Sequence, residues 1–239
     1  MDGERVALIT GAGSGIGRAI ALGIAARGAR TWIVGRRAEA LAETVAQAPK
    51  ADLCTIAADL TNDTELAHVR DAVRADGDTL NVLVHCAGAI TPGSVQEALV
   101  ADLDAQYQVN LRARFQLTQA LLPMLIAGRG DVVFINSTAA WGPRPGVSQY
   151  AAIHAAMRSL ADSLRAEVNR EGVRVLSVFP GRTASPLQRR LHAVEGKSYR
   201  PERLVQPADV AAITLAALEL PRTAEVTEIA LRPLTAPGD

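Results

Sequence analysis

Short apolar runs rich in β-branched residues alternate along the chain with longer alanine-rich stretches. Several runs are apolar throughout, which is typical of parallel strands covered on both faces. The stretches between them repeat apolar residues at helical spacing, as Ile16, Ile20 and Ile24 do. The pattern predicts a doubly wound α/β fold, with a seven-stranded, mostly parallel sheet as the middle of three layers and helices on both faces. The predicted strands are Val6–Thr10, Thr31–Val34, Leu53–Ala57, Val82–His85, Val132–Asn136, Val173–Phe179 and Glu228–Leu231.

No internal repeat, low-complexity tract or linker interrupts this alternation, so we expect one domain over residues 1–239. The least regular part is the segment 181–207, which carries Pro186, Gly196, Pro201 and Pro207. Ligands of open α/β sheets bind beyond the carboxyl ends of the strands. Because this segment follows the sixth predicted strand, we expect a substrate lid there; a plain surface loop is the alternative.

Composition narrows the class of protein. The 25 basic residues balance the 25 acidic ones, and 49% of the residues are hydrophobic. The balance of charges argues against a protein that binds nucleic acid or an anionic membrane. The high hydrophobic content argues against disorder. The two cysteines, Cys54 and Cys86, lie far apart, and the four histidines are scattered. We therefore expect no disulfide scaffold, no metal site and a reducing, cytoplasmic environment.

A glycine-rich loop follows the first predicted strand and leads directly into a helix. Glycines allow positive φ angles and let backbone amides approach a pyrophosphate, and the helix N-terminus adds partial positive charge there. A tight strand–helix turn without a ligand is the alternative, but the context of the loop favours dinucleotide binding. The expected phosphate-side residues are Gly11, Gly13, Ser14, Gly15, Ile16 and Gly17.

The end of the second predicted strand indicates which dinucleotide is preferred. A carboxylate there would hold the adenosine ribose of NAD, but this chain has Gly35 followed by Arg36 and Arg37. A guanidinium can form two parallel charged hydrogen bonds with a 2′-phosphate. We therefore expect NADP(H) to be preferred over NAD(H), with Arg36 as its ligand; a solvated start of the next helix is the alternative.

In chain order, these and later motifs resemble the short-chain dehydrogenase/reductase family over essentially the whole chain. Residues 10–17 match its TGxxxGxG loop, and residues 86–88 keep the end of its NNAG segment. Ser137 precedes Tyr150 by thirteen residues, the spacing of the family's catalytic serine and tyrosine. The other matches are the acid–aliphatic pair Asp59 and Leu60, then Asn110, and then Pro180 and Gly181. The resemblance implies a Rossmann-type fold and nicotinamide-dependent oxidoreduction.

The resemblance also implies roles for single residues. Tyr150 passes a proton to the carbonyl oxygen, Ser137 positions that oxygen, and Asn110 tethers a proton-relay water. The position of His154 implies a fourth catalytic residue. Beyond the glycine loop and Arg36, the implied cofactor-binding residues are Asp59, Leu60, Ala87, Gly88, Tyr150, His154, Pro180, Gly181 and Thr183.

His154 departs from the family pattern, which has lysine four residues after the tyrosine. An imidazole is shorter than a lysine side chain and is mostly neutral at pH 7. A unit charge about 4 Å away is worth roughly 4 kcal/mol at an effective dielectric of 20, so its loss would leave the pKa of Tyr150 high. Neutral Tyr150 suits carbonyl reduction better than alcohol oxidation. We also hypothesise that His154 acts as a pH-gated lysine, with activity falling as pH rises through the imidazole pKa.

Two aromatic side chains near these motifs each have two interpretations. His85 stands where the family has asparagine and either contacts the cofactor or is satisfied by a backbone carbonyl. Trp141 either lines the substrate pocket or packs in the core.

The leading functional hypothesis is an NADP(H)-dependent oxidoreductase that reduces a ketone or aldehyde of a small organic molecule, or oxidises the alcohol. The first alternative keeps the Ser–Tyr pocket for elimination, ring opening or cyclisation without redox chemistry. The second is a non-catalytic dinucleotide-binding subunit. Stoichiometric NADPH consumption separates the first of these alternatives from the leading hypothesis.

The resemblance further implies a homodimer or homotetramer that pairs the helices predicted over Asp102–Ala127 and Tyr150–Arg170. Its apolar stripe would come from Leu117, Leu121, Met157 and Leu160. Burial of the same side chains within one subunit is the competing interpretation.

Overall fold

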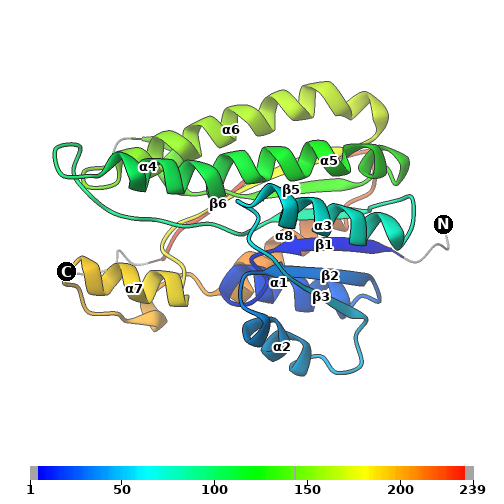
Figure 1. The fold of residues 1–239 in the computed structure, drawn as a ribbon, viewed down its shortest axis with the longest axis horizontal. Helices are drawn as coiled ribbons and strands as arrows, with labels where there is room; N and C mark the ends of the chain where they lie inside the picture. The colour runs from blue at the N-terminus through cyan, green and yellow to red at the C-terminus, as the bar shows by residue number, and fades with distance from the viewer. Residues whose placement is uncertain (1–4, 143, 235–239) are drawn as a thin grey trace.

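Seven parallel strands form one sheet in the order β3-β2-β1-β4-β5-β6-β7. They are seen in a computed structural model that describes residues 5–142 and 144–234 (Figure 1). Every strand pairing among these residues is parallel, so the predicted α/β fold is confirmed, and the ends of four strands agree with the prediction. The strands are β1 (Val6–Thr10), β2 (Arg30–Gly35), β3 (Leu53–Ala57), β4 (Val82–His85), β5 (Asp131–Ile135), β6 (Arg174–Pro180) and β7 (Glu228–Leu231).

Helices cover both faces of the sheet, each above its own apolar core (Figure 1). The first core joins the sheet to α3, α5 and α6, and the second joins it to α1, α2 and α8. The strand order reverses between β1 and β4, which places the ligand crevice of such a sheet at their carboxyl ends. The helices are α1 (Gly15–Ala25), α2 (Ala38–Ala46), α3 (Asp63–Ala75), α4 (Val100–Tyr107), α5 (Ala113–Ala127), α6 (Ser148–Val168), α7 (Pro186–Val194) and α8 (Pro207–Leu218).

The long helix predicted over Asp102–Ala127 is not one regular helix. It begins at Val100, and a π-helical turn, Gln108–Arg112, separates α4 from α5. A π turn widens the helical hydrogen-bond ring by one residue, and such turns are frequent at functional sites. The helix predicted over Tyr150–Arg170 is α6, which starts two residues earlier and gives way to a short 3₁₀ turn after Val168.

The apolar residues proposed for a stripe between subunits pack inside this one. Leu117, Leu121 and Met157 have no exposed surface and belong to the first core, and Leu160 packs against it. The interpretation as burial within the subunit is therefore correct for these side chains. Any pairing of α5 and α6 between subunits has to use their outer faces.

Proline begins helices in the segment 181–207 rather than only breaking them. Pro186 opens α7, where the Ser185 hydroxyl accepts a hydrogen bond from the Gln188 amide, and Pro207 opens α8. Proline suits a first turn because the amide that it lacks has no helical partner there. A parallel bridge between Thr183 and Val205 closes the base of the segment.

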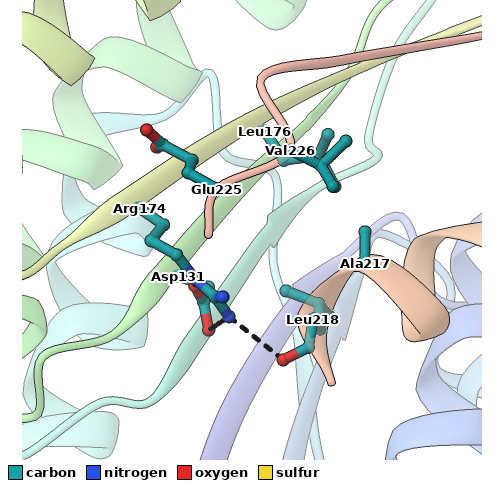
Figure 2. A pocket seen from close by; sticks show the side chains of 7 residues that line it. All are labelled: Asp131, Arg174, Leu176, Ala217, Leu218, Glu225 and Val226. Carbon is teal, nitrogen blue, oxygen red and sulfur yellow. Dashed lines mark hydrogen bonds and ion pairs between the residues drawn. The ribbon is translucent and has the colours of Figure 1, made fainter. Parts of the chain in front are cut away.

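An ion network lies at the amino ends of β5 and β6, whereas ligands of such a sheet bind at the carboxyl ends of the strands. Figure 2 shows Asp131, Arg174 and Leu218 of this network. Arg174 contacts the Asp131 carboxylate at 2.6 Å and donates to the Leu218 carbonyl at 3.0 Å. Arg222 contacts the same carboxylate at 3.2 Å. The adjoining cavity measures about 10 Å³, enough for at most one water, so it is not a substrate site.

Two further features are excluded for residues 5–142 and 144–234. No helix there has both the length and the apolar character needed to cross a membrane. No group of three histidine, cysteine, aspartate or glutamate side chains is placed to hold a metal ion.

Asp131→Ala should destabilise the fold by about 3 kcal/mol, because it leaves the Arg174 guanidinium buried without its carboxylate. Urea unfolding measures this change. Asp162→Ala is the matched control: Asp162 pairs with Arg165, but its side chain is 48% exposed, so the loss should stay below about 1 kcal/mol. Equal losses in the two variants would show that burial does not determine the strength of the Asp131 pair.

Candidate functional site

The glycine loop after β1 is folded tightly under the loop that follows β4. Gly11 and Gly15 have φ angles of +68° and +55°, which disfavour residues with side chains. A Cβ on Gly11 would lie 2.7 Å from the Ala87 amide nitrogen, and one on Gly17 would collide with the Gly11 carbonyl. Ser14, the N-cap of α1, makes no side-chain capping bond. This leaves the helix N-terminus available to a phosphate and fits the predicted dinucleotide.

Thr10 ties the glycine loop to the end of β4. Its hydroxyl donates to the Val84 carbonyl at 3.3 Å and accepts from the amides of Cys86 and Ala87 at 3.0 and 3.2 Å. These bonds join β1 and β4, which flank the point where the strand order reverses. The sequence analysis did not single out this side chain, although it begins the matched loop.

The predicted adenosine side brings Arg36 and Asp59 together at the carboxyl ends of β2 and β3. Burial alone would raise the pKa of Asp59. Hydrogen bonds from the Thr61 amide and hydroxyl, at 3.0 and 2.8 Å, and the charge of Arg36 nevertheless lower it. Arg36 is exposed beside Gly35, and Leu60 is buried. The arrangement provides an acceptor in Asp59 and an exposed guanidinium in Arg36.

The predicted catalytic residues Ser137 and Tyr150 come together from β5 and α6. Ser137 follows the end of β5 by two residues, and Tyr150 lies in the first turn of α6. Burial raises the pKa of Tyr150, and the nearby Ser137 hydroxyl with the charges of Arg114 and Arg144 offsets only part of this rise. Tyr150 is therefore protonated at neutral pH.

His154 packs its ring against Tyr150 one turn away, with ring centroids 4.1 Å apart. Its Nδ1 lies 2.6 Å from Asn136 Oδ1, which also accepts a hydrogen bond from the Ser137 amide. Because that oxygen is an acceptor, Nδ1 must carry the imidazole proton. Asn136 Nδ2 completes the pair by donating to the His154 carbonyl at 3.2 Å.

The remaining nitrogen of His154, Nε2, is buried and has no hydrogen-bond partner within the described part of the chain. Burial lowers the pKa of His154 to about 3, and the charge of Arg114 contributes to the decrease. The imidazole is thus neutral from pH 5 upward. The hypothesis of a pH-gated lysine is wrong for this reason, because no protonation step falls between pH 5.5 and 8.

Asn110 lies in the π-helical turn and uses both atoms of its amide on Ala89. Its Oδ1 accepts from the Ala89 amide at 2.9 Å, and its Nδ2 donates to the Ala89 carbonyl at 2.8 Å. It is completely buried, so it anchors the loop after β4 to the helix beneath. Its predicted role in holding a relay water stays a prediction.

His85 is not satisfied by a backbone carbonyl, and its contact with the cofactor stays a prediction. It is buried, stacks on Phe134 with ring centroids 4.9 Å apart, and places Nε2 2.8 Å from the Thr118 hydroxyl. Burial keeps the pKa of His85 well below its usual value. It is therefore a neutral core side chain bonded to another side chain rather than to a carbonyl.

The residues predicted near the nicotinamide lie at the end of β6. Gly181 donates its amide to the Leu231 carbonyl at 2.7 Å, and the buried Thr183 hydroxyl donates to the Gly181 carbonyl at 3.1 Å. A Cβ on Gly15 would lie 3.3 Å from Ser185 Cβ, so the start of the segment 181–207 covers the glycine loop. Trp141 is 45% exposed, and its ring packs on the buried ring of Phe179. It therefore has both an exposed surface and a contact with the core.

The geometry agrees with comparisons with known proteins. Residues 5–196 match the family model described as short chain dehydrogenase. The chain belongs to this family. A protein of Sinorhizobium fredii named an uncharacterized short-chain type dehydrogenase/reductase is 34% identical over 238 residues, which cover 98% of this chain and 93% of that protein.

Solved structures agree on the fold. A metagenomic short-chain oxidoreductase in complex with NADP is 28% identical, with a TM-score of 0.82 over 97% of this chain and 98% of that one. An alcohol dehydrogenase from Thermococcus sibiricus, complexed with 5-hydroxy-NADP, gives a TM-score of 0.88 at 23% identity over 99% of this chain and 100% of that one. This short-chain dehydrogenase is accordingly an oxidoreductase, and relatives that hold NADP are consistent with a nicotinamide dinucleotide cofactor.

The sequence analysis missed two polar residues of this short-chain dehydrogenase. Asn136 fixes the tautomer of His154, and Arg114 is a buried guanidinium one helical turn after Asn110. A signal for Arg114 was present, because residues 114, 117, 121 and 125 share one face of the helix and the other three are leucines. A charge on an otherwise apolar face indicates a buried polar group.

His154 should make stability fall as the medium becomes acidic. Its pKa in the folded protein lies below the unfolded value of about 6.5, so the unfolded state takes up the proton first as pH falls. Below pH 6.5 this linkage lowers the free energy of unfolding by up to about 1.4 kcal/mol per pH unit. Urea unfolding at pH 7.5 and pH 5 should show a smaller difference for His154→Gln than for the wild type. Equal differences would contradict a buried, neutral His154.

Proposed function

We propose that this short-chain dehydrogenase is an NADP(H)-dependent reductase of a ketone or aldehyde carbonyl on a small organic molecule. The observation that carries the proposal is the protonated Tyr150 hydroxyl, which lies near Ser137 and beside the neutral imidazole of His154. Because the pKa of Tyr150 is raised, its phenol is protonated at neutral pH, and the protonated form can donate a proton but cannot accept one. This favours reduction of a carbonyl over oxidation of an alcohol at neutral pH.

The side chains act together on the carbonyl oxygen. NADPH, when bound, supplies a hydride to the carbonyl carbon. The Ser137 hydroxyl donates a hydrogen bond that orients the oxygen, and Tyr150 gives it the proton as negative charge develops. The product is the alcohol, and Tyr150 regains its proton from water.

The cofactor would lie across the carboxyl ends of the strands, from β3 to β6. Its pyrophosphate would meet the α1 N-terminus and the glycine loop at residues 11–17, whose glycines leave the backbone bare. Arg36 would pair with the 2′-phosphate, which is why we propose NADP(H) over NAD(H). Asp59 and Leu60 would hold the adenine end, and the nicotinamide end would contact Ala87, Gly88, Tyr150, His154, Pro180, Gly181 and Thr183.

His154 would bind the nicotinamide ribose in a different way from lysine. With its proton fixed on Nδ1, the unpaired Nε2 offers a lone pair, so it accepts a hydrogen bond from a ribose hydroxyl. A lysine would donate instead. The neutral ring thus supplies orientation without charge.

The segment 181–207 would cover the substrate, and two subunits would pair through the outer faces of α4, α5 and α6. Leu103, Tyr107 and Phe115 are exposed on α4 and α5. A shallow hollow of about 560 Å³ runs along the outer face of α6 near Arg158 and Asp162. Exposed apolar side chains are typical of a surface that a second copy covers.

Calorimetric titration with NADPH and NADH tests the cofactor assignment without a substrate. We expect tighter binding of NADPH, and Arg36→Ser should weaken it by about tenfold, as loss of a charged hydrogen bond does. NADH binding should not change. Arg37→Ser is the control, since Arg37 is also exposed and stands one position further along the chain. Equal affinity of the wild type for both dinucleotides would overturn the NADP(H) preference, and binding of neither would overturn the reductase proposal.

A further inference from the structure

Arg114 places a guanidinium inside the protein next to the proposed site. It lies on α5 with 4% of its surface exposed, one turn after Asn110. One nitrogen donates to the Ile135 carbonyl at 2.8 Å, and the other terminal nitrogen donates to the Ala87 carbonyl at 2.8 Å. Ile135 is the last residue of β5, and Ala87 lies two residues after the end of β4. Arg114 therefore connects the loop that carries Ser137 with the loop that carries Gly88.

The charge of Arg114 has no carboxylate partner within ion-pair distance among residues 5–142 and 144–234. Its Nε is buried and makes no hydrogen bond there either. Burial lowers the pKa of Arg114, yet a guanidinium stays protonated at neutral pH. Burying an uncompensated charge is costly, so a nearby anion would be strongly stabilised.

The groups around this charge are neutral in the resting protein. Its positive charge lowers the pKa of Tyr150, and it also helps to keep the imidazoles of His85 and His154 unprotonated. The Cys86 thiol is neutral as well, because burial raises its pKa to about 12. Tyr150 becomes an anion when it gives its proton to a substrate.

We propose that Arg114 is the electrostatic partner of Tyr150 and stabilises, from α5, the phenolate left when Tyr150 donates its proton. This inference rests on the proposed function, because it assigns the positive charge that neutral His154 on α6 does not supply. Arg114 acts through Tyr150 and is thus a positioning residue, held in place by the carbonyls of Ile135 and Ala87.

The other groups that face Tyr150 do not provide an equivalent charge. Ser137 is uncharged, and His154 is neutral. Arg144, in the loop before α6, is exposed and donates to the Thr138 hydroxyl at 3.0 Å. Water and salt screen an exposed guanidinium far more than a buried one.

The test measures the ionisation of Tyr150 alone, without cofactor or substrate. Tyr150 is replaced by a ring-fluorinated tyrosine, whose phenol ionises at lower pH, and ¹⁹F NMR follows its titration. Removing the charge in Arg114→Gln should move the midpoint upward, with about tenfold less phenolate at a fixed pH below it. Arg114→Lys, which keeps a charge, should restore most of the phenolate, and so should His154→Lys added to Arg114→Gln.

Arg165→Gln is the matched control. Arg165 also donates to backbone carbonyls, those of Val175 and Thr227, but it lies fifteen residues along α6 from Tyr150, about 22 Å away. Its loss should leave the midpoint in place. An unchanged midpoint in folded Arg114→Gln would overturn the proposal. If that variant does not fold, Arg114→Met, which removes the charge and keeps an unbranched side chain, decides in its place: about tenfold less phenolate than in Arg114→Lys supports the role of charge, and equal midpoints in the two variants contradict it.

The outcome separates this inference from the reductase proposal. A protein that binds no nicotinamide dinucleotide but shows the midpoint shift would retain the Arg114–Tyr150 partnership without the proposed reaction. A protein that reduces carbonyls with NADPH but shows no shift would retain the reaction and lose the role of Arg114.

Discussion

The hydrogen bond between His154 Nδ1 and Asn136 Oδ1 determines the chemistry of the site. It joins α6 to the end of β5 and fixes the imidazole proton on Nδ1, because the Asn136 oxygen is already an acceptor for the Ser137 amide. The ring is thereby held against Tyr150, and its Nε2 is left as a lone pair. Loss of this bond would free the ring and remove the orientation of both Ser137 and Tyr150.

Because the imidazole of His154 is neutral, it does not supply the positive charge that a lysine at position 154 would supply. Arg114 places a guanidinium on the neighbouring helix, buried against the carbonyls that follow β4 and end β5. Burial makes this charge both costly and effective, because little water screens it. The π-helical turn ahead of α5 and the bonds between Asn110 and Ala89 hold the same loop from the other side. The site is therefore built from two helices and two strand ends, and each depends on the others.

The fold was predictable from the sequence because apolar runs and helical spacing report burial directly. The pairing of Ser137 with Tyr150 was expected from the resemblance to the short-chain dehydrogenases, whose catalytic serine and tyrosine have the same spacing. The state of His154 was not predictable, because it depends on Asn136, eighteen residues away, and on burial by the tertiary structure. Arg114 was missed because a lone arginine in a helix is usually exposed. Its place on the face of Leu117 and Leu121 is what marks it as buried.

The most direct test of the neutral site is ¹⁵N NMR of the His154 imidazole, assigned by comparison with His154→Gln. The chemical shifts of the two nitrogens report where the proton lies without any need for a substrate. We predict a protonated Nδ1 and an unprotonated Nε2, unchanged from pH 7.5 to 5.5. Titration of His154 near pH 6.5, or a proton on Nε2 at neutral pH, would contradict this prediction.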